Sequence, residues 1–459
     1  MHTYLADRAL LAHGWAENVL IEIEPEGNIA SIGAGGGGPV ASGVERIEGI
    51  VLPGMIDLHS HAFQRGLAGL TQRLPEGEAS FWGWREQMYA FAARLRPEDQ
   101  AAIAAQLYVE LLKGGYTSVV EFHYLHHQPD GRPYRDRAAM SLALHEAAIE
   151  AGIALTLLPV VYMQAGVAGE PLEGAQRRFA LDPEGWMRLA ETLDRAFKDD
   201  PHRRLGLALH SVRAVPQRAI AEAVAAALGH GGPMPIHVHL AEQPREVRDC
   251  LERFGKRPLA VLQEAADVNH GWCLVHGTHL TPEELAQVAR QQAVIGLCPT
   301  TEADLGDGIF PLGEHLALGG LFGIGSDGNI ATDAAAELRL LEQGQRLAHL
   351  RRTVATSAAQ PHCGQTLWCE ALAGGAKAAG RPVGRLAPGF RADLIVLDRH
   401  HPSLIAKTGG QILDSLLFAP GLPVRDVMVG GVWCVRDGHH AAQAAVARAY
   451  RQALERALA

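Results

Sequence analysis

The sequence has few cysteines, no long apolar stretch and no cluster of basic residues, and each of these absences excludes a class of protein. Its six cysteines stand among 459 residues without any Cys-x-x-Cys spacing. This usage argues against a disulfide scaffold or a structural zinc knot and is typical of reduced thiols in a core. No segment approaches the roughly 18 apolar residues of a membrane span, and the first residues lack the pattern of a secretion signal. We therefore expect a cytoplasmic protein that does not associate with membranes.

The charge and size of the chain point to a small-molecule partner. The formal net charge is -10 and no basic run is present, so we expect no nucleic-acid partner. Hydrophobic residues make up 47% of the chain, enough for a large core in two or three domains or in one barrel with an attachment. The overall field would not attract an anionic substrate, so arginines inside a pocket would have to bind it.

Short β-rich apolar runs alternate with longer alanine-rich stretches from Val51 onward, a pattern typical of βα units. The eight runs span residues 51–61, 116–124, 154–163, 204–212, 234–242, 273–280, 293–300 and 321–328. Eight parallel strands with intervening helices favour an α/β fold of the (β/α)8 TIM-barrel type, which we place at residues 51–381. The helix at 281–291 has clear start signals, with Thr281 as N-cap, Pro282 in the first turn and Glu284 completing a capping box.

The two chain ends have a different pattern, in which short alternating strands are separated by glycine turns. We expect residues 1–50 and 382–440 to pair into one small β-sandwich beside the barrel. The glycine run at 33–38 lacks the flanking strand, helix and spacing of a phosphate-binding loop, so we interpret it as a plain loop. Residues 441–459 form an amphipathic pattern, and we expect this C-terminal helix to pack on its own subunit rather than on a partner.

Histidines and one aspartate stand at the carboxyl ends of these runs, which form a single rim in a barrel. His59 and His61 are one residue apart with Asp57 in the same alternation, so all three share one face of a strand. The other ends carry His210, His237, His239, His276 and Asp327. Nitrogen ligands with one carboxylate oxygen suit a divalent metal that keeps an open position for water. We expect Asp57 and His237, which lie deeper, to support the ligands rather than to bind the ion.

The segments "PGMIDLHSH", "HVHLAE", "LVHGTHL" and "GSDG" resemble the amidohydrolase superfamily of metal-dependent barrels, and the resemblance extends to the "LAPGFRADLIVLD" segment near the other end of the chain. The resemblance implies that His59, His61, His239 and Asp327 bind the metal. It also implies that Glu242 moves protons and that His276 orients or deprotonates the metal-bound water. Members of this family with two metals carry a bridging lysine or glutamate on the third or fourth strand, and neither run contains one. This departure favours a single divalent ion, with zinc preferred, and leaves His276 free for catalysis.

Mononuclear members with a glutamate three residues after the fifth-strand histidine are mostly deaminases, so the resemblance implies hydrolysis of a C=N bond. Glu242 then protonates the leaving nitrogen, which departs as ammonia. Asp327 accepts a proton as well as binding metal, and His276 stabilises the charge of the tetrahedral intermediate.

Two arginines near the rim, Arg85 and Arg213, suit a substrate with two carboxylates. Each guanidinium group can pair with a carboxylate through two hydrogen bonds. The segments "SHAFQRGLAGLTQ", "FWGWREQMY", "EFHYLHH" and "SVRAV" resemble one branch of the superfamily. That branch hydrolyses N-formimino-L-glutamate to N-formyl-L-glutamate and ammonia in histidine degradation. By this analogy the substrate-binding residues are Gln64, Arg85 in the long first loop, Tyr124, His210 and Arg213.

Two rival functions stay open at this point. The same metal site could deaminate an aromatic base such as guanine or a pterin, with Trp82, Trp84 and Tyr124 as stacking partners, although paired arginines suit such a base poorly. The chain could also be a catalytically silent barrel that serves as a binding module, but no expected ligand or catalytic residue is missing. We further expect a homodimer, by analogy with relatives.

Overall fold

Eight parallel strands form a closed barrel in the computed structural model, which describes residues 1–34, 43–72, 81–421 and 423–459. Strand pairing runs in the order β6-β5-β13-β12-β11-β10-β9-β7-β8, and pairing between β6 and β7 closes the barrel. The strands are β5 (Met55–Ser60), β6 (Tyr116–His123), β7 (Ala154–Val161), β8 (Arg203–Leu205), β9 (Leu207–Ser211), β10 (Ile236–Leu240), β11 (Trp272–His276), β12 (Val294–Leu297) and β13 (Leu321–Ile324). The short β8 and β9 both fall within the fourth predicted run. The prediction of a (β/α)8 barrel is confirmed.

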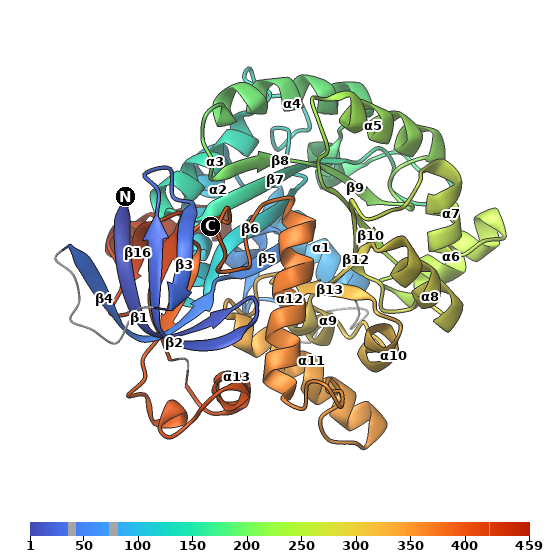
Figure 1. Cartoon of the computed structure of the whole chain (residues 1–459). Coiled ribbons are helices and arrows are strands. Elements are labelled where there is room, and N and C mark those ends of the chain that lie inside the picture. Colours follow the sequence, from blue (N-terminus) through green and yellow to red (C-terminus); the bar gives the residue numbers. More distant parts are fainter. Residues whose placement is uncertain (35–42, 73–80, 422) are drawn as a thin grey trace.

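Helices cover the outside of this barrel (Figure 1). They are α1 (Phe81–Ala92), α2 (Pro97–Lys113), α3 (Ala139–Ala151), α4 (Pro183–Phe197), α5 (Gln217–Gly229), α6 (Pro244–Phe254), α7 (Pro258–Ala265), α8 (Pro282–Gln291), α9 (Pro299–Leu305), α10 (Leu312–Ala317), α11 (Ala334–His349) and α12 (Cys363–Ala379), with 3-10 turns η1 (Ala62–Leu67) and η2 (Gly174–Phe179). The predicted capping box is present at the start of α8, where the Thr281 side chain accepts the N–H of Glu284. Strands enclosed by helices are buried on both faces, and this explains why β7 is a continuous apolar run with every residue buried.

The two chain ends pair into one eight-stranded sheet beside the barrel, with the strand order β17-β16-β15-β14-β4-β1-β2-β3. Its strands are β1 (His2–Leu11), β2 (Gly14–Ile23), β3 (Ile29–Ala34), β4 (Val44–Pro53), β14 (Leu394–Leu397), β15 (Val424–Val429), β16 (Val432–Arg436) and β17 (His439–His440). In Figure 1 the blue N-terminal strands lie next to the red C-terminal strands. Gly33 and Ala34 end β3, whereas residues 35–38 of the glycine run lie outside the described residues.

The first predicted run, 51–61, divides between this sheet and the barrel. Val51 and Pro53 belong to β4, where they pair with β14, and the chain then enters β5 after Gly54. A Cβ atom at Gly54 would lie 2.2 Å from the Thr117 side chain on β6. Only glycine therefore permits this close passage from the sheet into the barrel wall.

The last elements are η3 (Pro402–Leu404), α13 (Gly410–Phe418) and α14 (Gln443–Leu458). Helix α14 packs on α2 of the same chain with Val446, Ala453 and Ala457 buried, and Arg456 forms a 2.6 Å ion pair with Asp99 of α2. Among the helices that the structure describes, none has the length and apolar character to cross a membrane.

Candidate active site

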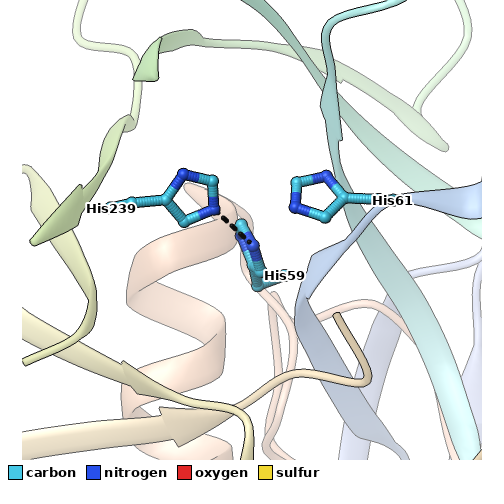
Figure 2. A group of neighbouring side chains, drawn as sticks. All are labelled: His59, His61 and His239. Carbon is cyan, nitrogen blue, oxygen red and sulfur yellow. Dashed lines mark hydrogen bonds between the residues drawn. The ribbon is translucent and has the colours of Figure 1, made fainter. Parts of the chain in front are cut away.

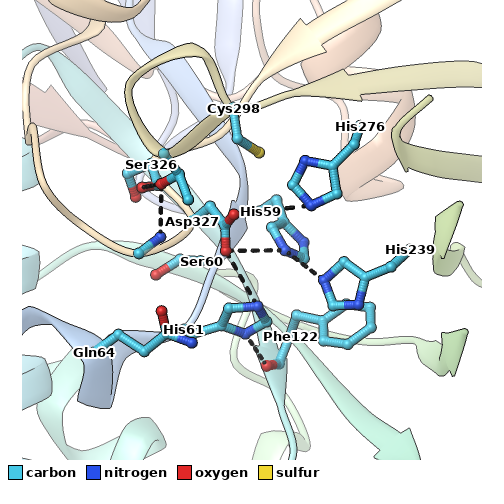
Figure 3. A network of polar contacts seen from close by, with 12 residues as sticks. His59, Ser60, His61, Gln64, Phe122, His239, His276, Cys298, Ser326 and Asp327 are labelled. Atoms are coloured by element: carbon cyan, nitrogen blue, oxygen red, sulfur yellow. Dashed lines mark hydrogen bonds and ion pairs between the residues drawn. The ribbon is translucent and has the colours of Figure 1, made fainter. Parts of the chain in front are cut away.

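The histidines predicted to bind metal meet at the carboxyl ends of the barrel strands (Figure 2), and Asp327 lies beside them (Figure 3). His59 and His61 lie at the end of β5, His239 lies in β10, and Asp327 follows β13. The Nε2 atoms of His59 and His239 are 3.1 Å apart. Asp327 Oδ1 lies 3.2 Å from His61 Nε2 and 3.5 Å from His59 Nε2. All four side chains are buried.

Hydrogen bonds to main-chain carbonyls assign the tautomers of two of these rings. His61 donates its Nδ1–H to Phe122 O at 2.8 Å, and His239 donates its Nδ1–H to His210 O at 2.9 Å. Their Nε2 atoms then face the centre as lone pairs, and the carboxylate of Asp327 adds a negative charge beside them. Converging lone pairs of this kind repel one another unless a cation lies between them. The donor set of three imidazoles and one carboxylate therefore fits a divalent metal ion.

A polar network beneath the centre fixes Asp327 (Figure 3). The backbone of Asp327 is in the left-handed region at φ 45°. Asn329 holds this turn by donating to Asp327 O at 2.9 Å and to His61 O at 3.0 Å. Asp57 accepts the N–H of Ser326 at 2.9 Å. Asp57 thus lies below the ligands, as the sequence predicted.

His237 also lies away from the centre. Its Nε2–H donates to Ala378 O of α12 at 2.9 Å, and the ring is fully buried. His237 uses Nε2 in this bond and belongs to none of the groups of described residues with metal-ligand spacing, so it supports the barrel wall.

His276 and Glu242 lie on the open side of the metal-ligand group. His276 Nε2 is 3.8 Å from Glu242 Oε1 and 3.9 Å from Asp327 Oδ2. Burial alone would lower the pKa of the His276 imidazole, but the surrounding carboxylates, Glu242 first among them, outweigh it and raise the pKa to about 10. Burial raises the pKa of Glu242 to about 7, although the charges of His276 and Arg213 oppose the rise. The pair thus combines an imidazolium with a carboxyl group that titrates near neutrality.

A cavity opens over this centre. Its walls include all five predicted substrate-binding residues, Gln64, Arg85, Tyr124, His210 and Arg213, together with Glu242, His276 and Asp327. Arg85 was expected in a loop and lies instead in α1, whose Phe81, Met88 and Phe91 are buried against the barrel. Residues that sequence reasoning missed also line the cavity, among them Tyr89, Tyr162 and Phe179.

The two arginines are arranged around the indole of Trp82. The guanidinium carbon of Arg85 lies 4.4 Å from the ring centroid and that of Arg213 lies 5.7 Å from it. Within the part of the chain that the structure describes, Arg213 Nη1 and Arg85 Nε are buried without a hydrogen-bond partner. Buried donors without partners are costly, so both groups are suited to an anionic ligand.

Two further carboxyl groups at this site were not identified from the sequence. Glu302 of α9 lies 3.2 Å from His276 Nδ1. Asp307 follows α9 and accepts from the side chain of Gln243, and burial together with the charge of Glu242 raises the pKa of Asp307 to about 9. Their only sequence signal is an acidic pair shortly after the seventh strand, in "CPTTEADLGDG".

Comparison with known proteins gives consistent matches over the whole chain. The sequence profile of the amidohydrolase family matches residues 50–434, and that of the N-terminal domain of formimidoylglutamate deiminase HutF matches residues 1–43. The chain is 50% identical to formimidoylglutamate deiminase of Pseudomonas aeruginosa, with 99% of both chains covered. It is 28% identical to 8-oxoguanine deaminase of the same organism, with 87% of this chain and 85% of that protein covered.

Solved structures with the same fold include an amidohydrolase from Brucella melitensis, with a TM-score of 0.93 and 42% identity over 100% of both chains. An adenosine deaminase from Xanthomonas campestris with bound zinc has a TM-score of 0.83 at 21% identity, with 99% of this chain and 98% of that chain covered. At that identity the likeness shows the fold alone.

Proposed function

The chain belongs to the amidohydrolase family and, within it, to the formimidoylglutamate deiminases, and from this premise we propose that it hydrolyses N-formimino-L-glutamate to N-formyl-L-glutamate and ammonia. The observation that carries the proposal is the cavity that joins the metal-ligand group to Arg85 and Arg213. This substrate offers one amidine carbon and two carboxylates, which match the two halves of that cavity.

The carboxylate half of the cavity is assigned to Arg85 and Arg213 with three neutral donors. Gln64 Nε2 donates to Tyr124 Oη at 2.8 Å, so the Tyr124 hydroxyl keeps its own proton for a ligand. His210 is fixed by a 3.2 Å contact between its Nδ1 and the hydroxyl of Ser211. These groups bind and orient the substrate, and the arginines select it by charge.

At the amidine half, His59, His61, His239 and Asp327 would hold one divalent metal ion, which supplies a Lewis acid that lowers the pKa of a bound water toward neutrality. Glu242 accepts a proton from the attacking water and passes it to the leaving nitrogen. Asp327 accepts the remaining proton of the water and returns it to the same nitrogen, so that the C–N bond breaks and ammonia leaves. The His276 imidazolium stabilises negative charge as the tetrahedral intermediate forms. We assign zinc as this ion, because three imidazoles and one carboxylate are typical zinc ligands.

Deamination of an aromatic base is the alternative that the cavity favours less. Phe179 and Trp84 line the cavity and could stack on a base. A neutral base, however, would leave two guanidinium groups without an anion in a buried site, and that cost disfavours guanine or a pterin.

We also propose that the protein is a cytoplasmic homodimer whose only substrate partner is a small dicarboxylate, with neither nucleic acid nor membrane involved. The free thiols of all six cysteines support a reducing compartment. Light scattering should give twice the chain mass of 49.2 kDa. A mass equal to that of one chain would contradict the dimer.

The proposed activity is tested by incubating purified, zinc-loaded protein with N-formimino-L-glutamate and measuring both ammonia and N-formyl-L-glutamate. N-formimino-glycine, which lacks the second carboxylate, and guanine serve as controls. We expect equal amounts of the two products and little turnover of either control. Turnover of guanine equal to or faster than that of N-formimino-L-glutamate would overturn the assignment.

A further inference from the structure

A buried carboxylate lies behind His276, on the side away from the cavity. Glu302 is 5% exposed and belongs to α9, which follows the seventh barrel strand, β12. Its Oε1 atom lies 3.2 Å from His276 Nδ1 and also accepts the backbone N–H of Cys298 at 2.9 Å. The reaction outlined above gives Glu302 no part.

This contact determines which nitrogen of His276 faces the substrate. A carboxylate oxygen only accepts hydrogen bonds, so the Nδ1 atom that faces Glu302 carries a proton. The opposite nitrogen, Nε2, then points toward Glu242 and Asp327, at 3.8 and 3.9 Å. His276 is the last residue of β11, and its backbone is in the left-handed region at φ 68°.

We propose that Glu302 is a positioning residue for the hydrolysis, because it holds the His276 ring by its Nδ1–H and thereby turns Nε2–H toward the place where negative charge develops in the intermediate. The backbone N–H of Cys298 holds the Glu302 oxygen in place, so the two groups form a rigid support behind the ring. A carboxylate behind a catalytic histidine is a known way to fix the tautomer of an imidazole. The kinetic part of this inference rests on the proposed function.

A second metal ion is the competing explanation for the same residues. His276, Cys298 and Glu302 place one ligand atom each within 4.8 Å of one another. The hydrogen bonds argue against an ion there, because Glu302 Oε1 already accepts from two donors.

Two substitutions separate the hydrogen bond from the negative charge. Glu302→Gln keeps an oxygen that the Cys298 N–H holds facing Nδ1, so the hydrogen bond from Nδ1–H is kept and only the charge is lost. Glu302→Leu removes both. The matched control is Glu337→Gln, because Glu337 is also buried and accepts the N–H of Thr300 in α9 at 2.9 Å, but it touches no group of the cavity.

We expect kcat to fall about 100-fold in Glu302→Leu and about tenfold in Glu302→Gln, with KM for N-formimino-L-glutamate changed less than about threefold in both. The control variant, Glu337→Gln, should keep kcat within about threefold of that of the parent protein. A Glu302→Leu variant with the kcat of the parent protein would overturn the proposal, as would an effect on KM alone. Metal analysis completes the test, because a fall from two zinc ions per chain to one in Glu302→Gln would assign the residues to a second metal instead.

A readout that needs no substrate separates this inference from the proposed function. Nitrogen NMR of zinc-loaded protein with ¹⁵N-labelled histidine reports the protonation of each ring nitrogen, and the signals lost in His276→Asn identify His276. We expect protonated Nδ1 in the parent protein and in Glu302→Gln, and a changed Nδ1 signal in Glu302→Leu. Identical His276 signals in all three proteins would overturn the inference. Absence of turnover with an Nδ1 signal that responds to Glu302 would overturn the proposed function alone.

Discussion

His239 and His237 lie two residues apart on one strand and have different surroundings. His239 donates Nδ1–H to His210 O and turns Nε2 toward the centre, whereas His237 uses its Nε2 to reach Ala378 O. We expect His239→Ala to lose the metal ion. We expect His237→Ala to keep the metal and to lose about 1–3 kcal/mol of unfolding free energy with its buried hydrogen bond. Elemental analysis and urea denaturation measure the two effects, and loss of metal in both variants would refute the distinction.

Glu242 is expected to move protons without binding the ion. Its substitution by glutamine keeps the size of the side chain and removes its basicity. Glu242→Gln should therefore retain one metal per chain while kcat falls by about 10²- to 10⁴-fold. Glu252→Gln, at an exposed position of α6, the helix that follows Glu242, serves as the control and should keep full activity. Normal turnover by Glu242→Gln would remove the proton-transfer role.

The pH dependence of kcat/KM is expected to follow the titration of Glu242. Burial raises the pKa of Glu242 to about 7, so its carboxylate form is lost as the pH falls through that value. Because the carboxylate accepts the first proton, kcat/KM should be constant above about pH 7 and fall about tenfold per pH unit below it. A profile that stays flat from pH 8 to pH 5 would contradict this assignment.

At the scale of elements, the strands were predictable and one helix was not. Buried parallel strands separated by helices give long apolar runs with clear ends, so the histidines at those ends could be assigned to one rim. The α1 segment contains glycine and several aromatic residues, which favour helix weakly. Its helix depends on the packing of Phe81, Met88 and Phe91 against the barrel, which the local sequence does not reveal. Arg85 was therefore placed in a loop.

The contact between Glu302 and His276 was not predictable for a related reason. The two residues are 26 positions apart and lie on different βα units, so no spacing rule connects them. The histidines expected to bind metal were easier to find, since His59 and His61 alternate on one strand and carry a family motif.

Helix α1 also carries Trp82, on which three guanidinium groups converge. Arg245 of α6 lies 4.3 Å from its ring centroid, in addition to Arg85 and Arg213. We expect Trp82→Ala to raise KM for N-formimino-L-glutamate about tenfold, equivalent to about 1.4 kcal/mol, with little change in kcat. Trp82→Phe should recover part of the loss because it keeps an aromatic face.

The matched control for Trp82 lies in the sheet formed by the chain ends. The guanidinium carbon of Arg436 lies 4.4 Å from the ring centroid of Trp433. Both residues belong to β16, which is outside the barrel that carries the cavity. Trp433→Ala removes a contact of the same kind and should leave KM unchanged. An equal rise of KM in Trp82→Ala and Trp433→Ala would mean that the loss at Trp82 reflects reduced stability of the protein rather than a contact at the cavity.

At the scale of the whole molecule, an acidic chain places three arginines together where the substrate is expected to bind. The net charge is -10, yet Arg85, Arg213 and Arg245 gather at one mouth of the barrel. Composition alone indicated that an anion would need such local arginines. The pairing of the two chain ends was also predictable from their strand patterns. The passage of β4 into β5 through Gly54 was not, because it depends on the side chain of Thr117.

The central claim is that residues from distant strands form one metal centre that drives the hydrolysis. Its most direct test is to strip the protein with a chelator and add zinc in steps while measuring ammonia release from N-formimino-L-glutamate. We predict no turnover by the stripped protein, a linear rise with added zinc and a sharp end point at one ion per chain. Full activity in the stripped protein, or an end point at two ions per chain, would contradict the account.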